Sequence, residues 1–222
     1  MGAFGGPNIV EDGLVFAADA GNAQCYTSGS ATATNLIGGQ TLTLENGSGD
    51  LIQPYDNSWG FDGSDDYIDC GTDFYFETGL SICYFMKMSS TDISQGIISK
   101  YASENYGIWY NGTLNFNIKT SSWDGIGIAS YQGTYLNGTW NHIACTWDGS
   151  NRYIYVNGEQ KATGAKTGTI TDNGKSTRIG ILEGAAGYVF TGEIGCCLFY
   201  NKGITSSEIL QNYNATKDRF GL

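Results

Sequence analysis

The scarcest features of this 222-residue chain are its two prolines, its single histidine and its eleven Lys and Arg residues. Twenty-two Asp and Glu residues outnumber those cations, so the formal net charge is −11. That charge repels phosphate backbones and anionic lipid surfaces, and we expect neither a nucleic-acid nor a membrane partner. No stretch approaches the ~20 consecutive apolar residues that a spanning helix needs. The composition therefore excludes the classes of protein that bind through basic surfaces or insert into bilayers.

What the chain has instead is glycine and aromatic residues. Thirty-three glycines and an aromatic content of 14% are typical of many short strands joined by tight turns, and not of a helical bundle. A chain of this length fits one large β-sandwich and can bury roughly 70% of its unfolded surface. We therefore expect a single core that needs neither metal nor disulfide bridges.

Six cysteines are present, and no two have the close spacing of a zinc or redox site. Several lie within apolar strand patterns, where reduced cysteine behaves as a small hydrophobic residue. The first seven residues lack the basic start and apolar run of a signal peptide, so we expect no secretory route. We interpret the thiols as free and mostly buried. They are Cys25, Cys70, Cys83, Cys145, Cys196 and Cys197.

Strand patterns become clear from residue 59 onward. Residues 80–88 are almost all apolar and predict a central strand buried on both faces. Residues 106–110 and 114–119 form a hairpin through Asn111-Gly112, and residues 140–156 predict another. Thr205 and Glu208 have the spacing of a capping box, which predicts a helix starting there.

These segments carry a resemblance to a known family. Residues 61–68 (FDGSDDYI), 140–158 (WNHIACTWDG through YVNG) and 177–205 resemble the strands and closing helix of laminin-G-type, concanavalin A-like domains. The resemblance covers about residues 10–217. It implies an all-β fold: a two-sheet antiparallel β-sandwich of jelly-roll topology, six or seven strands in each sheet, with one short C-terminal helix. We expect an arm at 1–12, the sandwich at 13–217 and a polar tail at 218–222.

Residues 5–15 also resemble the start of laminin-G-type structural proteins of tailed bacteriophages. That resemblance implies a non-enzymatic virion-surface protein: a capsid decoration, fibre or tail component in several copies, made in the host cytoplasm. Its expected partners are other virion structural proteins, further copies of itself in a homo-oligomer, and a glycan of the host cell surface. We expect Phe4, Ile9 and Val10 to be exposed docking residues, because a short arm cannot bury them alone. The alternatives are a carbohydrate-binding adhesin module that is not tied to a virion and, behind it, a glycoside hydrolase.

Aromatic residues in the middle of the chain indicate a possible glycan site. Aromatic faces beside amide and carboxylate groups suit the stacking and hydrogen bonding of a sugar. Aromatic residues also fill sandwich cores and subunit interfaces, and that alternative stays open. The candidate ligand-binding residues are Trp109, Tyr110, Trp123, Asp124 and Tyr131.

Catalytic and metal signals are weak. Glycoside hydrolysis needs two carboxylates flanking one bond, and no strand carries the Glu-x-Asp-x-Glu spacing that would supply them. His142 sits within a predicted central strand and is interpreted as structural. Many relatives hold calcium through two acidic residues where this chain has Gly195 and Cys196. No cofactor is required, but a structural calcium could still use Asp19, Asp62 and Glu193.

Overall fold

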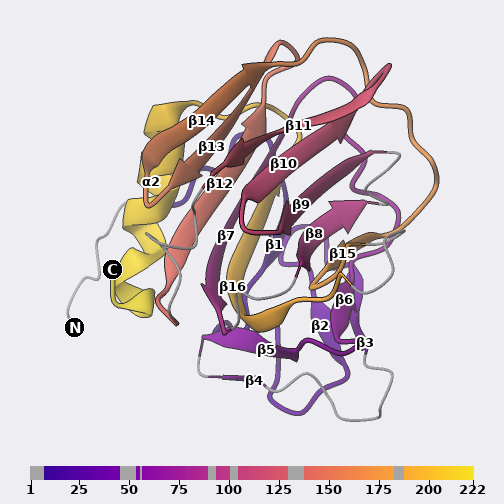
Figure 1. The fold of residues 1–222 in the computed structure, drawn as a ribbon. Coiled ribbons are helices and arrows are strands. Elements are labelled where there is room, and N and C mark those ends of the chain that lie inside the picture. Colours follow the sequence, from indigo (N-terminus) through magenta and orange to yellow (C-terminus); the bar gives the residue numbers. More distant parts are fainter. Residues whose placement is uncertain are drawn as a thin grey trace.

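The computed structural model describes residues 8–45, 54–55, 57–89, 94–100, 105–129, 138–182 and 188–222. Within these residues, two antiparallel sheets of eight strands pack face to face, and a short helix lies against one of them (Figure 1). This is the predicted all-β sandwich with its C-terminal helix, although each sheet has more strands than expected. None of the described helices is long and apolar enough to cross a membrane.

Sheet A is built around the longest apolar strand pair. Its order is β14 (Glu159–Ala165), β13 (Asn151–Val156), β12 (Asn141–Trp147), β7 (Leu80–Met88), β16 (Thr191–Tyr200), β5 (Ser58–Asp62) and β4 (Pro54–Tyr55), and β1 (Leu14–Ala18) also pairs with β16. Strand β7 lies between β12 and β16 and is buried on both faces, which confirms the prediction of a central strand. Its near-continuous apolar sequence is explained by this double burial.

Sheet B carries the predicted middle hairpin. Its order is β11 (Trp123–Ile128), β10 (Leu114–Lys119), β9 (Tyr106–Tyr110), β8 (Gln95–Lys100), β15 (Thr177–Ile179), β6 (Tyr67–Asp69), β3 (Thr41–Glu45) and β2 (Thr32–Thr34). Strands β9 and β10 keep the predicted bounds, and Gly112 in their turn has a φ of 88°. Alternate residues of both sheets face each other and form one core, which includes Trp59, Trp147, Phe116 and Tyr106.

Helix α2 (Ser206–Thr216) covers the outer face of sheet A. The predicted capping box is confirmed: Thr205 Oγ1 accepts the Glu208 amide, and the Glu208 carboxylate accepts the Thr205 amide at 2.6 Å. Ile209 is fully buried in a second cluster with residues of β7, β12, β13 and β16. Because this cluster lies outside the sandwich core, the central strands β7, β12 and β16 of sheet A are apolar on both of their faces.

The C-terminal residues pack on sheet A as well. A short 3-10 helix, η1 (Lys217–Phe220), places the Phe220 ring in a stack on Phe85, with ring centroids 4.0 Å apart. Arg219 forms two hydrogen bonds with the Asp19 carboxylate, at 2.6 and 2.7 Å. Residues 218–222, which we expected to be a polar tail, therefore help to cover the sheet.

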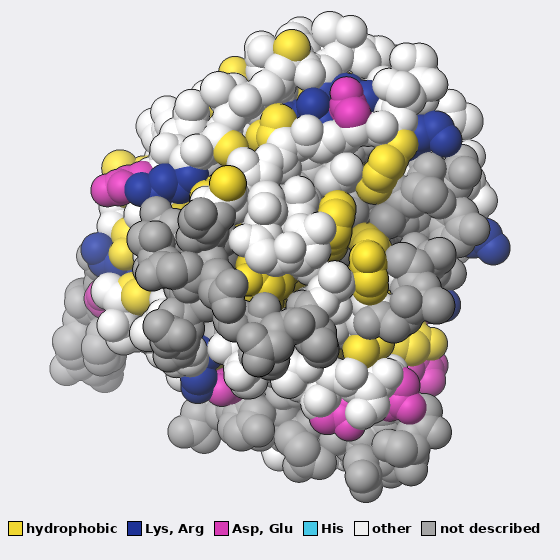
Figure 2. Space-filling view, viewed as in Figure 1, with side chains coloured by type: hydrophobic (Ala, Val, Ile, Leu, Met, Phe, Trp, Pro, Cys, Tyr) yellow, Lys and Arg dark blue, Asp and Glu magenta, His cyan; other side chains and the backbone are white. Residues whose placement is uncertain are grey.

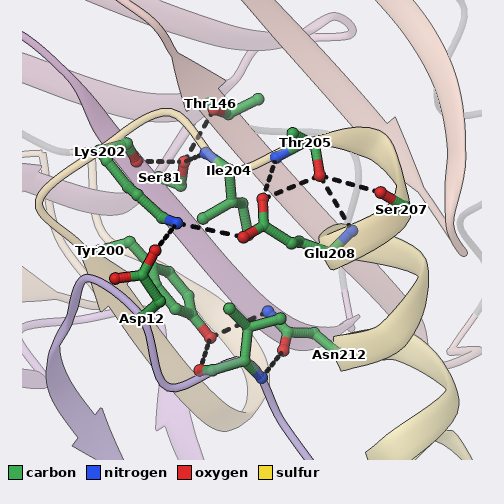
Figure 3. A network of polar contacts seen from close by, with 11 residues as sticks. Asp12, Ser81, Thr146, Tyr200, Lys202, Ile204, Thr205, Ser207, Glu208 and Asn212 are labelled. Atoms are coloured by element: carbon green, nitrogen blue, oxygen red, sulfur yellow. Dashed lines mark hydrogen bonds and ion pairs between the residues drawn. The ribbon is translucent and has the colours of Figure 1, made fainter.

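The described part of the N-terminal arm is also packed down (Figure 3). The Val10 amide donates to Asn212 Oδ1 of α2 at 2.8 Å, and Tyr200 donates its hydroxyl hydrogen to the Val10 carbonyl at 3.0 Å. Lys202 pairs with Asp12 and Glu208 beside them. Val10 is buried and Ile9 half-buried, which corrects the expectation that both are exposed. Val10 packs against helix α2, which lies about 200 residues away in the sequence, so a local sequence pattern could not predict this contact. Phe4 lies outside the described residues.

The cysteines and His142 are interior groups. All six thiols are buried, as predicted, and burial raises the pKa of Cys83 to about 12. His142 lies between the rings of Phe85 and Tyr213, and burial lowers its pKa to about 3. The imidazole is therefore neutral at ordinary pH and covered by α2. This placement agrees with a structural role for His142.

Candidate functional site

The outer face of sheet B differs from that of sheet A, because among the described residues no helix packs on it (Figure 1). One row of outward residues crosses the whole sheet in register. It comprises Gly125, Asn117, Gly107, Ser99, Arg178, Asp69, Thr43 and Thr32. Most of these side chains are small or uncharged. In the view of Figure 1, hydrophobic and uncharged polar side chains lie near the centre, and most Asp, Glu, Lys and Arg side chains lie toward the rim (Figure 2).

Trp109 is a large aromatic residue of β9 on this surface. It is half-buried and points outward from β9, because its neighbours Ile108 and Tyr110 face the core. Its indole Nε1 donates to Asn117 Oδ1 at 3.0 Å. Its ring stacks on Tyr188, with centroids 6.1 Å apart and planes inclined by 16°. The indole is therefore held in one orientation from two sides.

Two asparagine amides lie next to Trp109 on β10. Asn115 Nδ2 donates to Asn111 Oδ1 at 3.1 Å and to the Thr113 carbonyl at 2.7 Å. Strand β11 has glycine opposite both asparagines, and a Cβ at Gly125 would come within 2.4 Å of the Asn117 side chain. The missing side chains let the amides lie over the β11 backbone. Among the described residues, no hydrogen bond involves Asn115 Oδ1 or Asn117 Nδ2.

The structure separates the five predicted ligand-binding residues. Trp109 is on the outer face of sheet B, and Trp123 is half-buried on the same face, at the far end of β11. Tyr110 is fully buried in the core between the sheets, which removes its ring from the surface. Tyr131 lies outside the described residues. Tyr188 and Asn117 belong to the site but were not predicted; alternation along β10 could have shown Asn117, whereas the Tyr188 contact is non-local.

Asp124 has a different environment from the one we expected. Its carboxylate lies 2.6 Å from the Arg152 guanidinium of β13 and 3.0 Å from the Lys166 ammonium. Both cations are nearly buried, with side chains 4% and 5% exposed. The ion pairs connect the edge of sheet B to the edge of sheet A. Asp124 is thus engaged in closing the sandwich, away from Trp109.

The three expected calcium ligands do not form one cluster. Asp19 is bound by Arg219, and Glu193 accepts hydrogen bonds from Lys87 at 2.6 Å and from Ser58 at 2.8 Å. Asp62 lies instead with Asp65 and Asp66, whose carboxylate oxygens are all within 4.8 Å of one another. Burial raises the pKa of Asp66 to about 6. Asp19 and Glu193 therefore do not fit a calcium ion, which takes ~6–8 oxygen ligands.

Solved structures share this fold at low sequence identity. The binding domain of Paraclostridial Mosquitocidal Protein 1 superposes with a TM-score of 0.67 over 91% of this chain at 14% identity. The ligand-binding domain of botulinum neurotoxin serotype D, solved with N-acetylneuraminic acid, also has a TM-score of 0.67, over 91% of this chain at 14% identity. This chain spans about half of those toxin domains, 52% and 50%.

Domain 4 of AbnA, an extracellular arabinanase of Geobacillus stearothermophilus, was solved with arabinotriose. It matches 92% of this chain and is itself covered completely, with a TM-score of 0.62 and 16% identity. No curated protein matches the sequence. A family model matches residues 61–210, about two thirds of the chain, which include the motifs at 61–68, 140–158 and 177–205 but not residues 5–15. The chain therefore belongs to the Laminin_G_3 family, within the concanavalin A-like lectin/glucanases superfamily.

Proposed function

We propose that this protein is a non-enzymatic glycan-binding module and that the outer face of sheet B is its binding surface. The observation that carries the proposal is Trp109, whose ring is held by Asn117 and Tyr188 beside the Asn115 amide. A fixed aromatic face with adjacent amides can stack on a sugar ring and bind its hydroxyl groups at little entropic cost. Sheet A has no equivalent open surface under α2, because apolar side chains fill that contact.

The solved relatives support the class of ligand. AbnA domain 4, which this chain covers over its whole length, was solved with arabinotriose. This chain covers only half of the toxin domain that was solved with N-acetylneuraminic acid, so that ligand is weaker support for the class of sugar bound here. A neutral oligosaccharide is also the better match to a chain with a net charge of −11.

A non-catalytic role agrees with the ion pairing of three acidic residues that were candidates for ligand or metal binding. The carboxylates of Asp124, Asp19 and Glu193 are each neutralised by a cationic side chain. Glycoside hydrolysis needs one carboxyl group as an acid and a second as a base or nucleophile across an open bond-cleavage site. Carboxylates held in structural ion pairs are poorly suited to either task.

Trp109→Ala is the variant that tests this function. We expect it to weaken glycan binding about tenfold or more, because the stacking surface is removed. The measurement is a glycan array that includes arabinotriose, with and without calcium, followed by titration of any ligand found. Trp140→Ala is the matched control: Trp140 is a half-buried tryptophan that packs against Phe220 on the opposite sheet. An array on which the wild-type protein binds nothing would contradict the proposal.

We also propose that the module is carried on a bacteriophage virion, as a decoration, fibre or tail component in several copies. The support is the resemblance of residues 5–15 to the start of phage structural proteins. Residues 8–12 pack on the protein's own helix, so a docking segment would consist of residues 1–7, including Phe4. Removing residues 1–7 should abolish attachment to particles, measured by mass spectrometry of purified virions. A truncated chain that still decorates particles would refute this anchoring.

A further inference from the structure

A second concave site lies on the opposite sheet, at the N-terminal end of α2. It is a pocket of about 430 Å³, within the range of ~300–1,000 Å³ that small-ligand sites occupy. The chain enters α2 through Gly203–Ser206, which form one wall. The outer face of sheet A forms the floor, where β12 and β13 extend beyond the helix.

Two tyrosines and several hydroxyl groups line this pocket. Tyr153 and Tyr155 alternate on β13 and face the same side, with ring centroids 6.3 Å apart. Tyr153 pairs with Thr146 in register. Gln160 of β14 lies opposite Tyr155 and accepts its hydroxyl hydrogen at 3.4 Å. Tyr155 and Thr146 are buried, so the accessible lining combines the Tyr153 ring with the Gln160 amide and the hydroxyl groups of the loop.

A polar network fixes the wall relative to the floor (Figure 3). Ser81 Oγ lies 2.7 Å from the Thr146 hydroxyl and accepts the Ile204 amide at 2.9 Å. Thr205 is bound to Glu208 by the capping box. These contacts tie the strand floor to the loop before α2, so the pocket is preformed.

The charge of the pocket restricts the ligand. No lysine or arginine lines it, and its one ionisable group with negative charge is Asp148, an exposed residue on the rim. The positive end of α2 is already occupied by the Glu208 carboxylate, which also pairs with Lys202. Phosphate, sulfate and sialic acid would meet repulsion without a compensating cation. A neutral polyhydroxylated ligand meets only hydrogen-bonding groups and the Tyr153 ring.

We infer that this pocket is a second saccharide site, specific for a neutral sugar unit. The inference rests on the proposed function for the class of ligand, and on the pocket's own geometry for the place. The two sites occupy opposite sheets, so a single chain could bridge two glycan chains. Such bridging raises the overall avidity without new contacts at either site.

The experiment is an NMR titration of the isotope-labelled full chain with the methyl glycosides of glucose, galactose, mannose, xylose and arabinose. N-acetylneuraminic acid serves as the anionic comparison. We expect at least one neutral glycoside to shift the backbone amides of Gln160 and Ser206, and the anionic sugar to leave them unchanged. Tyr153→Ala should weaken this binding about tenfold. Gln160→Ala, a change at an exposed position, should weaken it without unfolding the protein.

The two sites control for each other. Trp109→Ala should leave the shifts at Gln160 and Ser206 intact, and Tyr153→Ala should leave those at Asn115 intact. If neutral sugars shift Asn115 but never Gln160 or Ser206, the second site is refuted and the proposed function stands. Equal shifts with N-acetylneuraminic acid would refute the specificity for neutral sugars. If no sugar shifts either set of amides, both proposals fall.

Discussion

Asp124→Asn should lower the free energy of unfolding by about 2 kcal/mol at neutral pH, although Asp124 itself is half exposed. The reason is the pair of cations it neutralises. Arg152 donates to the Asp124 carboxylate and carbonyl, and Lys166 donates to the Ser122 carbonyl beside it. An asparagine would leave two nearly buried positive charges without a counter-charge. Breaking a fully buried pair costs ~3–5 kcal/mol, and solvent at Asp124 reduces that figure.

The effect should depend on pH in a defined direction. Desolvation acts to raise the pKa of Asp124, but the Lys166 hydrogen bond and the Arg152 charge outweigh it and hold the pKa below its usual value. A carboxylate with a lowered pKa in the folded state stabilises the protein above its unfolded pKa of ~3.9, and this contribution is lost as pH falls through the folded value. The difference between wild type and Asp124→Asn should therefore shrink below about pH 4.

Denaturant unfolding at several pH values measures this difference. Asp218→Asn is the charge-matched control, because Asp218 is an exposed carboxylate in η1 and should cost little. A ligand role for Asp124 predicts the opposite pattern, with glycan binding lost and stability kept. Equal stability of Asp124→Asn and the wild-type protein would show that the two sheet edges do not depend on this ion pair.

Gly96→Ala should destabilise the protein by about 3 kcal/mol and also weaken glycan binding. A Cβ at Gly96 would lie 1.9 Å from the Leu182 backbone nitrogen, so the backbone must move. Leu182 donates its amide to the Tyr188 carbonyl, and Tyr188 stacks on Trp109, which is paired with Gly96 across β8 and β9. Displacing this segment therefore takes away the ring that holds the Trp109 indole.

Ser99→Ala provides a graded comparison on the same strand. It removes the hydroxyl that donates to the Ile181 carbonyl at 3.0 Å, without adding an atom near the segment. We expect it to cost about 1 kcal/mol and to leave binding nearly unchanged. Thermal unfolding and tryptophan fluorescence would report the stability and the environment of the indole. The explanation is wrong if Gly96→Ala binds glycan as tightly as the wild-type protein does.

Local sequence patterns predicted most of the strands because their signals are short-range. The bounds of β7, β9 and β10 were predicted from apolar runs and turn residues. The start of α2 followed from Thr205 and Glu208. Strand β11 was missed, because its two glycines and half-exposed pattern resemble a loop. Those glycines leave room for the asparagine side chains of the neighbouring strand β10.

The sequence by itself determined the strand-rich class, the central strand, the helix cap and the burial of the cysteines, since each depends on composition, periodicity or residues within one turn. The two-sheet sandwich followed from the family resemblance. Only the tertiary structure decided which aromatic residues reach the surface. It placed Tyr110 in the core and Tyr188 beside Trp109. It also placed the Asp124 carboxylate in ion pairs with two nearly buried cations. These outcomes depend on partners distant in sequence, because a residue's exposure and charge environment are set by the strands that pack against it.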